Sequence, residues 1–255
     1  MRENRRQYLY VIQELTSREI KRKYARSYLG IIWSVLNPLL TMAVISAVFS
    51  TMFRRSIENF PIYYLTGYII WQLYSEATRA SMTVLVDNKN LLIKTKIPKI
   101  VFVMSRAYTA LTNFFFSCIA YALILAIFRI APSLVWLFFF YDLLIIMIFS
   151  IGVGAILSIM YVFFADIKHL YSVILTLLMY LSAIFYPVDR LPDVMKVVLD
   201  YNPIYLFIYI MRVAVMDGQI PDTIVLIKAT LFAVVFFAAG IITFNKKQND
   251  VMIHI

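Results

Sequence analysis

The residues best suited to bind a charged ligand lie near the start of the chain. Arg18, Arg22 and Arg26 recur every four residues, with Lys21 beside them. Side chains four apart share one face of an α-helix. The nearly opposite face is apolar and consists of Ile20, Tyr24 and Tyr28. This segregation predicts an amphipathic helix that lies on a membrane, with its basic face toward water or anionic headgroups.

A second interpretation of these basic residues stays open. Positive charge beside the first membrane span holds that segment on the cytoplasmic side, whatever else it does. This explains the charge but not its segregation to one face. Upstream, Tyr8, Val11, Ile12 and Leu15 form an apolar stripe at helical spacing. Residues 16–19, Thr-Ser-Arg-Glu, fit a capping box, so we expect a new helix to start there.

The segment 87–100 has the composition of a surface that binds another protein. It places the apolar residues Leu91, Leu92 and Ile93 in a short loop that also contains four lysines. Exposed apolar side chains framed by charge are typical of a protein-binding surface. The alternative is a loop that rests on lipid.

Aromatic residues suited to stacking on sugar rings crowd a later span. Tyr64, Tyr68 and Trp71 follow one another at i, i+4 and i+7 on one helix face, and Phe185 and Tyr186 form a further cluster. An aromatic belt at the membrane–water interface explains most of these residues. A sugar path along the Tyr64 face is the less favoured alternative on physical grounds.

The sequence contains no motif for catalysis or for a cofactor. It has no glycine-rich phosphate loop of the form G-x-x-x-x-G-K-[ST], and its two histidines are not clustered with cysteines or carboxylates. We therefore expect no catalytic residue, no metal and no cofactor in this chain. Glu76 and Arg79 lie three apart, so we expect them to form an ion pair. Gly152 and Gly154 are interpreted as helix-packing positions.

The composition shows which elements must position these residues. Of the 255 residues, 62% are hydrophobic and only 15% are charged. The mean hydropathy is +0.81. Soluble domains are about half apolar and about a quarter charged, so a helical membrane protein is the remaining class. A span needs about 20 apolar residues. We expect six spans, at 31–53, 60–86, 101–128, 143–165, 170–188 and 223–245.

The net charge of +10 follows the predicted topology. With both termini in the cytoplasm, fifteen basic residues are cytoplasmic: eight in 1–30, four in 87–100, and Lys168, Lys246 and Lys247. Six are external: Arg54, Arg55, Arg129, Arg190, Lys196 and Arg212. This bias obeys the positive-inside rule, so binding to nucleic acid is a remote option.

Within residues 189–217, the apolar run 201–211 has only about 11 residues, which is too short to cross the membrane. We expect two short helices there that lie in or dip into the external interface. The expected organisation is a cytoplasmic amphipathic segment, 1–30, followed by a six-helix transmembrane domain, 31–255. That domain includes a cytoplasmic loop at 87–100 and an external gate segment at 189–222.

Residues 15–40 resemble the start of the transmembrane subunits of polysaccharide ABC exporters of the type-2 class. Those subunits export O-antigen, capsule or teichoic acid. The matching positions are Arg18-Glu19-Ile20-Lys21, Lys23-Tyr24, Ser27, Leu29-Gly30, Trp33 and Asn37-Pro38. Leu191-Pro192 and Tyr201-Asn202-Pro203 are also similar to that class. The order of spans and loops agrees over essentially the whole chain.

The resemblance implies a homodimer driven by two copies of a separate ATPase that binds ATP and Mg²⁺. It implies an ATPase coupling helix within 87–97, with contacts from Asn88, Lys89, Asn90, Leu91, Leu92, Ile93 and Lys94. It implies that the lipid-linked substrate enters beside 8–29, where Arg18, Lys21, Arg22 and Arg26 would hold its pyrophosphate. It also implies glycan contacts from aromatic residues such as Tyr64, Tyr68, Trp71, Phe185 and Tyr186.

We therefore expect a permease in the bacterial plasma membrane that exports a lipid-linked polysaccharide and catalyses no covalent chemistry. Three alternatives remain: an ABC exporter of a drug or small lipid, a membrane-embedded transferase, and an ion-coupled carrier that uses Glu76.

Overall fold

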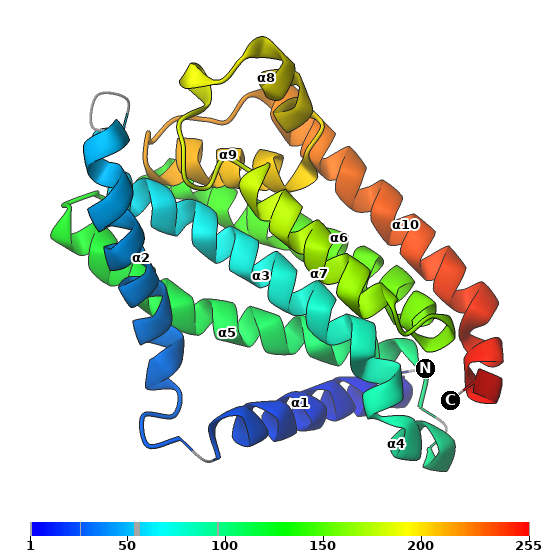
Figure 1. The fold of residues 1–255 in the computed structure, drawn as a ribbon. Coiled ribbons are helices and arrows are strands. Elements are labelled where there is room, and N and C mark those ends of the chain that lie inside the picture. The colour runs from blue at the N-terminus through cyan, green and yellow to red at the C-terminus, as the bar shows by residue number, and fades with distance from the viewer. Residues whose placement is uncertain (1, 26, 54–56, 96, 255) are drawn as a thin grey trace.

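The computed structural model describes residues 2–25, 27–53, 57–95 and 97–254, with the side chains of 2–6, 252 and 253 left out. Within these residues the chain is all-α (Figure 1). The long helices are α1 (Arg2–Tyr24), α2 (Ile32–Phe53), α3 (Phe60–Asp87), α5 (Ile100–Ile127), α6 (Leu137–Phe163) and α10 (Thr223–His254). The shorter ones are α4 (Lys89–Lys94), α7 (Ile167–Tyr180), α8 (Asp193–Asp200), α9 (Pro203–Val215) and the 3₁₀ turns η1 (Leu134–Trp136) and η2 (Val188–Arg190).

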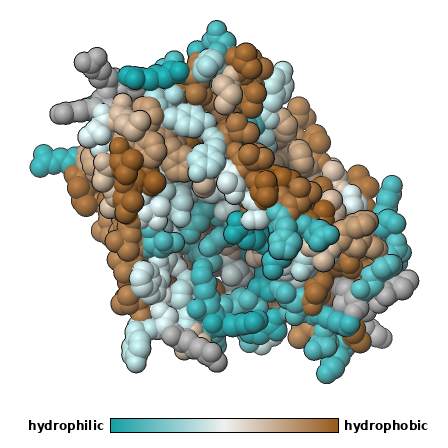
Figure 2. Space-filling view, viewed as in Figure 1, coloured by the Kyte–Doolittle hydropathy of each residue, from teal (hydrophilic) through white to brown (hydrophobic). Residues whose placement is uncertain are grey.

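The two ends of the helix bundle differ in what they carry. One end holds α1, α4 and the end of α10, and we call it the basal end. The other holds α8, α9, the end of α2 and the start of α3, and we call it the distal end (Figure 1). In Figure 2, apolar residues cover α2, whereas hydrophilic residues gather toward the basal end.

The described helices include four that are long and apolar enough to cross a membrane. These are α2, α5, α6 together with η1, and α10. The predicted all-α membrane class is thus confirmed, whereas the count of six spans stays a prediction. The second predicted span, α3, has 28 residues but carries Glu76, Arg79 and Asp87. The fifth, predicted over 170–188, is a helix of only 14 residues that ends at Tyr180.

Helix α1 runs without a break through the sequence that fits a capping box, so the helix start predicted at Thr16 is wrong. The Thr16 hydroxyl donates instead to the Ser105 carbonyl of α5 at 3.3 Å. The apolar stripe explains this placement, because Ile12 and Leu15 are buried and α1 packs on α5. Tyr28, predicted on the apolar face, follows the end of the helix and is exposed.

Helix α3 forms the centre of the bundle, packed between α5, α6 and α9. Small residues permit the closest contacts, as predicted for Gly152 and Gly154. A Cβ atom on Gly152 would lie 2.5 Å from the Phe236 carbonyl oxygen of α10, and one on Gly154 would lie 2.7 Å from Ser81. The backbones of α6 and α10 therefore approach more closely than larger residues permit.

The two short helices predicted before the last span are α8 and α9, which meet at an angle of 91°. Helix α9 packs inside the bundle, where it contacts α3, α6 and α10. Most of its side chains are buried. Asn202 begins the helix by accepting a hydrogen bond from the backbone N–H of Ile204 at 3.0 Å. Helix α9 is therefore part of the core at the distal end.

Candidate functional site

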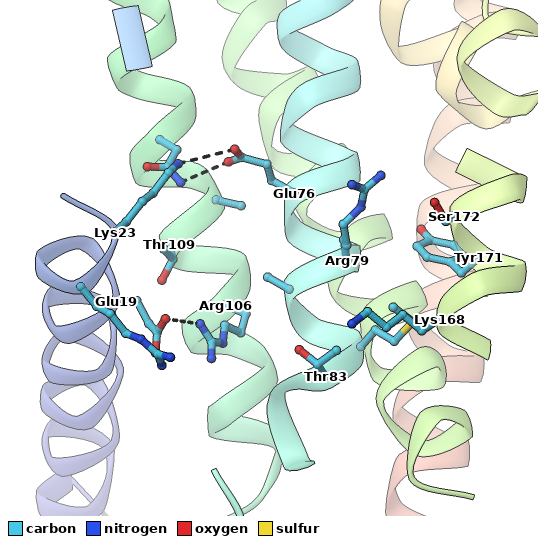
Figure 3. A pocket seen from close by; sticks show the side chains of 15 residues that line it. Glu19, Lys23, Glu76, Arg79, Thr83, Arg106, Thr109, Lys168, Tyr171 and Ser172 are labelled. Carbon is cyan, nitrogen blue, oxygen red and sulfur yellow. Dashed lines mark hydrogen bonds and ion pairs between the residues drawn. The ribbon is translucent and has the colours of Figure 1, made fainter. Parts of the chain in front are cut away.

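A cavity of about 700 Å³ opens at the basal end between α1, α3, α5 and α7 (Figure 3). Its charged lining residues are the cations Arg22, Lys23, Arg79, Arg106 and Lys168 and the carboxylates Glu19 and Glu76. We call it the basal cavity. Cations outnumber carboxylates by five to two, so the cavity attracts anions.

Helical periodicity on four separate helices brings this lining together. Helix α3 contributes Glu76, Arg79 and Thr83, at spacings of three and four. Helix α5 contributes Arg106, Thr109 and Asn113 in the same way, and α7 contributes Lys168, Tyr171 and Ser172. The last turn of α1 adds Arg22 and Lys23. Each helix therefore turns one polar stripe toward the same space.

Both carboxylates of the basal cavity are already paired. Glu19 Oε2 lies 2.6 Å from Arg106 Nη1, and Glu76 Oε1 lies 3.7 Å from Lys23 Nζ. The Asn113 amide also donates to Glu76 Oε2 at 3.1 Å. The predicted Glu76–Arg79 pair is therefore wrong. The side chain of Glu76 points toward α1 and α5, whereas Arg79 lies on the side nearer α7 (Figure 3).

Three cations of the basal cavity are not neutralised by a carboxylate of the described residues, so their charge is available to a bound anion. Arg22, Arg79 and Lys168 form no ion pair with any residue in the described ranges. They come from α1, α3 and α7, so they surround the space rather than line one wall. Phosphate groups are bound by this kind of arrangement, since several charged donors converge on one anion.

The basic residues predicted on α1 do not act as one surface. Of the four, only Arg22 lines the basal cavity, and Arg26 lies outside the described residues. Arg18 Nη2 donates to Asn88 Oδ1 at 2.7 Å. Arg18 and Lys21 line a groove of about 510 Å³ that also includes Leu91 and Ile97. We call this second space the α1–α4 groove.

The loop predicted to contact a partner protein contains the short helix α4. Its three apolar residues have different surroundings. Leu92 is only 5% exposed and packs in a core cluster with Leu15, Leu85 and Phe102, whereas Ile93 is 60% exposed. Leu91 is intermediate and faces the α1–α4 groove. Lys89, Asn90 and Lys94 are exposed, while Asn88 is buried at the start of the helix.

The predicted aromatic path is largely packed inside the bundle. Tyr64 and Trp71 are buried, and Tyr68 is half-buried. The ring of Tyr64 lies 5.4 Å from that of Tyr68 and 5.7 Å from that of Phe185. The backbone carbonyl of Tyr186 accepts a hydrogen bond from the Tyr63 hydroxyl of α3 at 2.8 Å. Of the five residues, Tyr68, Phe185 and Tyr186 are partly exposed.

A second cavity, of about 460 Å³, lies at the distal end. We call it the distal cavity, and its charged residues are Glu58, Asp189, Asp217 and Arg212. Tyr205 and Tyr209 of α9 also line it. Burial raises the pKa of Asp217, and the positive charge of Arg212 opposes this shift. Sequence reasoning counted Arg212 only as an external basic residue and missed this cavity.

Arg212 is buried and joins three parts of the distal end. Its guanidinium donates to the carbonyls of Ala183 at 2.9 Å, Tyr63 at 3.1 Å and Ile184 at 3.3 Å. It also lies 3.4 Å from the centre of the Tyr63 ring. Gly67 provides the space, because a Cβ atom there would lie 2.8 Å from Arg212 Nη2. The arginine thus fixes the turn after α7 to α3 and α9.

Sequence reasoning also missed Lys23, Arg79, Arg106 and Lys168 as parts of one site. The available signal was that Glu76, Arg79 and Arg106 are charged residues within apolar spans, which mark functional positions. The described residues contain no group of three or more His, Cys, Asp or Glu side chains that could hold a metal ion.

Comparison with known proteins connects this geometry to a family. The ABC-2 type transporter family matches residues 10–216. The O-antigen export system permease protein RfbA of Klebsiella pneumoniae is 27% identical over 242 residues, covering 94% of this chain and 93% of that protein. RfbA of Myxococcus xanthus is also 27% identical, covering 96% and 95%. The polysialic acid transport protein KpsM of Escherichia coli is 22% identical, covering 94% and 95%.

The family match covers α2 to α9 and all but the start of α1, and so includes every helix that lines the basal cavity. It confirms the resemblance found in the residues of 15–40. The chain belongs to the ABC-2 type transporter family of membrane proteins.

Proposed function

We propose that this chain is the permease subunit of an ATP-driven exporter of a lipid-linked polysaccharide. The observation that carries the proposal is the basal cavity, in which Arg22, Arg79 and Lys168 surround one space without ion-pair partners. Relatives that match nearly the whole chain are permeases for O-antigen and polysialic acid. A lipid-linked glycan carried on a phosphate or pyrophosphate would present an anion to the cavity, and a cationic cavity suits such a group.

The basal cavity receives the phosphate or pyrophosphate of the lipid anchor. Arg22 belongs to the substrate-binding set predicted from the sequence, and Lys23, Arg79, Arg106 and Lys168 extend that set. The chain moves its substrate without covalent chemistry. The ion-coupled alternative loses its support, because Glu76 is held by Lys23 and Asn113.

The basal end faces the cytoplasm of a bacterium, and the protein resides in the inner membrane. The positive-inside rule supports this orientation, because α1, α4 and the end of α10 bring most basic residues to that end. The distal end, with α8 and α9, is then external. The glycan path runs toward it past the partly exposed Tyr68, Phe185 and Tyr186.

ATP is bound and hydrolysed by a separate ATPase that docks on α4. The exposed Ile93 and the adjacent α1–α4 groove supply an apolar surface framed by Lys89, Lys94 and Lys21. Two copies of the chain form the permease with two ATPases. The apolar stripe Leu40, Val44, Val48 and Met52 on α2 is more than half exposed and offers surface for lipid or for the second copy.

The test is export of the cell's own glycan by variants of the basal cavity. We expect Arg79→Glu with Lys168→Glu to reduce export at least tenfold while the protein still reaches the membrane, because two attractive charges become repulsive. The matched control is Lys246→Glu, an exposed basic residue of α10 outside the basal cavity. Normal export by the double variant would contradict the proposed function of this cavity.

A further inference from the structure

Arg106 stands at the boundary between the basal cavity and α1. Its side chain is 12% exposed, and it lines the cavity beside Arg79 and Lys168. Its Nη1 lies 2.6 Å from Glu19 of α1, and its Nη2 lies 3.6 Å from Asp87 at the end of α3. The same guanidinium therefore holds α1 in place and faces the space that an anion would occupy.

The ion pair of Arg106 also extends to the start of α4. Asp87 is followed by Asn88, and Asn88 Oδ1 accepts a hydrogen bond from Arg18 at 2.7 Å. Arg18 and Glu19 are neighbours on α1, so one turn of α1 is fixed both to α5 and to the start of α4. A change at Arg106 can thus reach α4 through direct contacts.

We propose that Arg106 senses the substrate by exchanging Glu19 for the phosphate of the lipid anchor. This rests on the proposed function of the basal cavity. An arginine fork binds phosphate through two parallel hydrogen bonds. Arg22, Arg79 and Lys168 reinforce the phosphate from the other sides, whereas Glu19 has a single short contact. The exchange removes the link between Glu19 and α5, leaves Glu19 only its 3.5 Å contact with Arg18 of the same helix, and so loosens α1 from α5.

The exchange links occupancy of the cavity to the position of α1. The polar contacts that remain between α1 and α5 or α3 are longer, such as the Thr16 bond to Ser105 at 3.3 Å and the Lys23–Glu76 pair at 3.7 Å. The Arg18–Asn88 bond of 2.7 Å keeps α1 attached to the start of α4. Linkage is reciprocal, so anything that releases α1 beforehand must strengthen anion binding. An ATPase docked at α4 would respond to the release of α1, because Asn88 at the start of α4 is hydrogen-bonded to Arg18 of α1.

The test measures binding of farnesyl diphosphate to the full chain in lipid nanodiscs. Hydrogen exchange of residues 16–24 is recorded with and without this probe. We expect the probe to raise exchange in this part of α1 in the wild type. Glu19→Gln should show the raised exchange without the probe and bind the probe about fivefold more tightly, the lower range of ordinary coupling. Lys168→Gln should instead bind it more weakly.

A double-variant comparison separates the exchange from simple removal of a negative charge. If Glu19 acts through Arg106, Glu19→Gln tightens binding in the wild-type background but not in the Arg106→Gln background. An equal gain in both backgrounds would overturn the proposal. The control Asp250→Asn breaks the Lys247–Asp250 pair, of 3.2 Å, on α10, and should change neither measurement.

The outcomes distinguish this proposal from the one on which it rests. If the wild-type chain binds the probe but exchange in α1 stays the same, Arg106 is not a sensor and the cavity remains a headgroup site. If the wild-type chain does not bind the probe, the function proposed for the basal cavity fails, and the exchange fails with it. Size-exclusion profiles confirm that each variant is folded, and Arg106→Lys, which keeps the charge, should retain part of the response.

Discussion

The basal and distal cavities lie at opposite ends of the same bundle and carry opposite charge. Five cations and two carboxylates line the basal cavity, while three carboxylates and one arginine line the distal cavity. The arginines of the two cavities also differ in the partners that they contact. Arg79 of the basal cavity has no ion-pair partner among the described residues, whereas Arg212 of the distal cavity donates to three backbone carbonyls.

This difference shows that a basic residue in a membrane protein can serve binding or architecture, and that its partners decide which. Arg212 donates to three backbone carbonyls, and the carboxylates Glu58, Asp189 and Asp217 outnumber it, so the distal cavity keeps a net negative charge. An anionic headgroup is attracted at the basal end and repelled at the distal end. Such a pair of sites suits a protein that takes up an anionic anchor at one end only.

The largest effect should come from removing Arg212. Arg212→Leu leaves the carbonyls of Tyr63, Ala183 and Ile184 without their donor in a buried place, which costs about 3–5 kcal/mol. We expect a marked fall in the thermal unfolding temperature of the purified protein.

Two further variants refine this test of architecture. Gly67→Ala should act in the same direction, because its added Cβ would displace the guanidinium. Lys196→Leu, which breaks the exposed Lys196–Asp193 pair of 3.1 Å, serves as the control. Unchanged stability of Arg212→Leu would show that the distal arginine is not architectural.

The second effect concerns charge and compares the two cavities directly. Reversal of Arg79 and Lys168 to Glu should weaken farnesyl diphosphate binding about 1000-fold, since each reversal removes an attraction of about 1 kcal/mol and adds a repulsion of similar size. Reversal of Asp189 and Asp217 to Lys should leave the affinity of the basal cavity within twofold. Titration of all three proteins at two salt concentrations checks this. Equal losses in both double variants would contradict the assignment of the anion to the basal end.

The smallest effect tests the docking surface at the basal end. Ile93→Asp should weaken association with the partner ATPase about tenfold, because an exposed apolar contact is replaced by a charge, and it should leave the fold intact. Leu92→Asp should instead destabilise the permease, since Leu92 is buried among Leu15, Leu85 and Phe102. Co-purification and thermal unfolding distinguish the two. Normal association of Ile93→Asp would move the docking surface away from α4.

The sequence predicted much of the fold but less of the site. The hydrophobic runs located α2, α5, α6 and α10, and the resemblance located α4, because both depend on residues close together in the chain. The site depends on which helix faces meet. Arg18 and Arg22 differ by only about 40° around α1 at 3.6 residues per turn. That angle suffices to place Arg18 against Asn88 and Arg22 in the basal cavity.

The sequence by itself determined that this is an all-α membrane protein of the ABC-2 class with basic residues gathered at one end. The physical reason is that length, hydropathy and periodicity are local properties of each helix. Only the tertiary structure decided that Glu76 pairs with Lys23 rather than Arg79, that Arg106 holds Glu19, and that Arg212 is enclosed by carbonyls. These partners are at least 28 residues apart in the chain, and packing, not spacing, selects among the charges within reach.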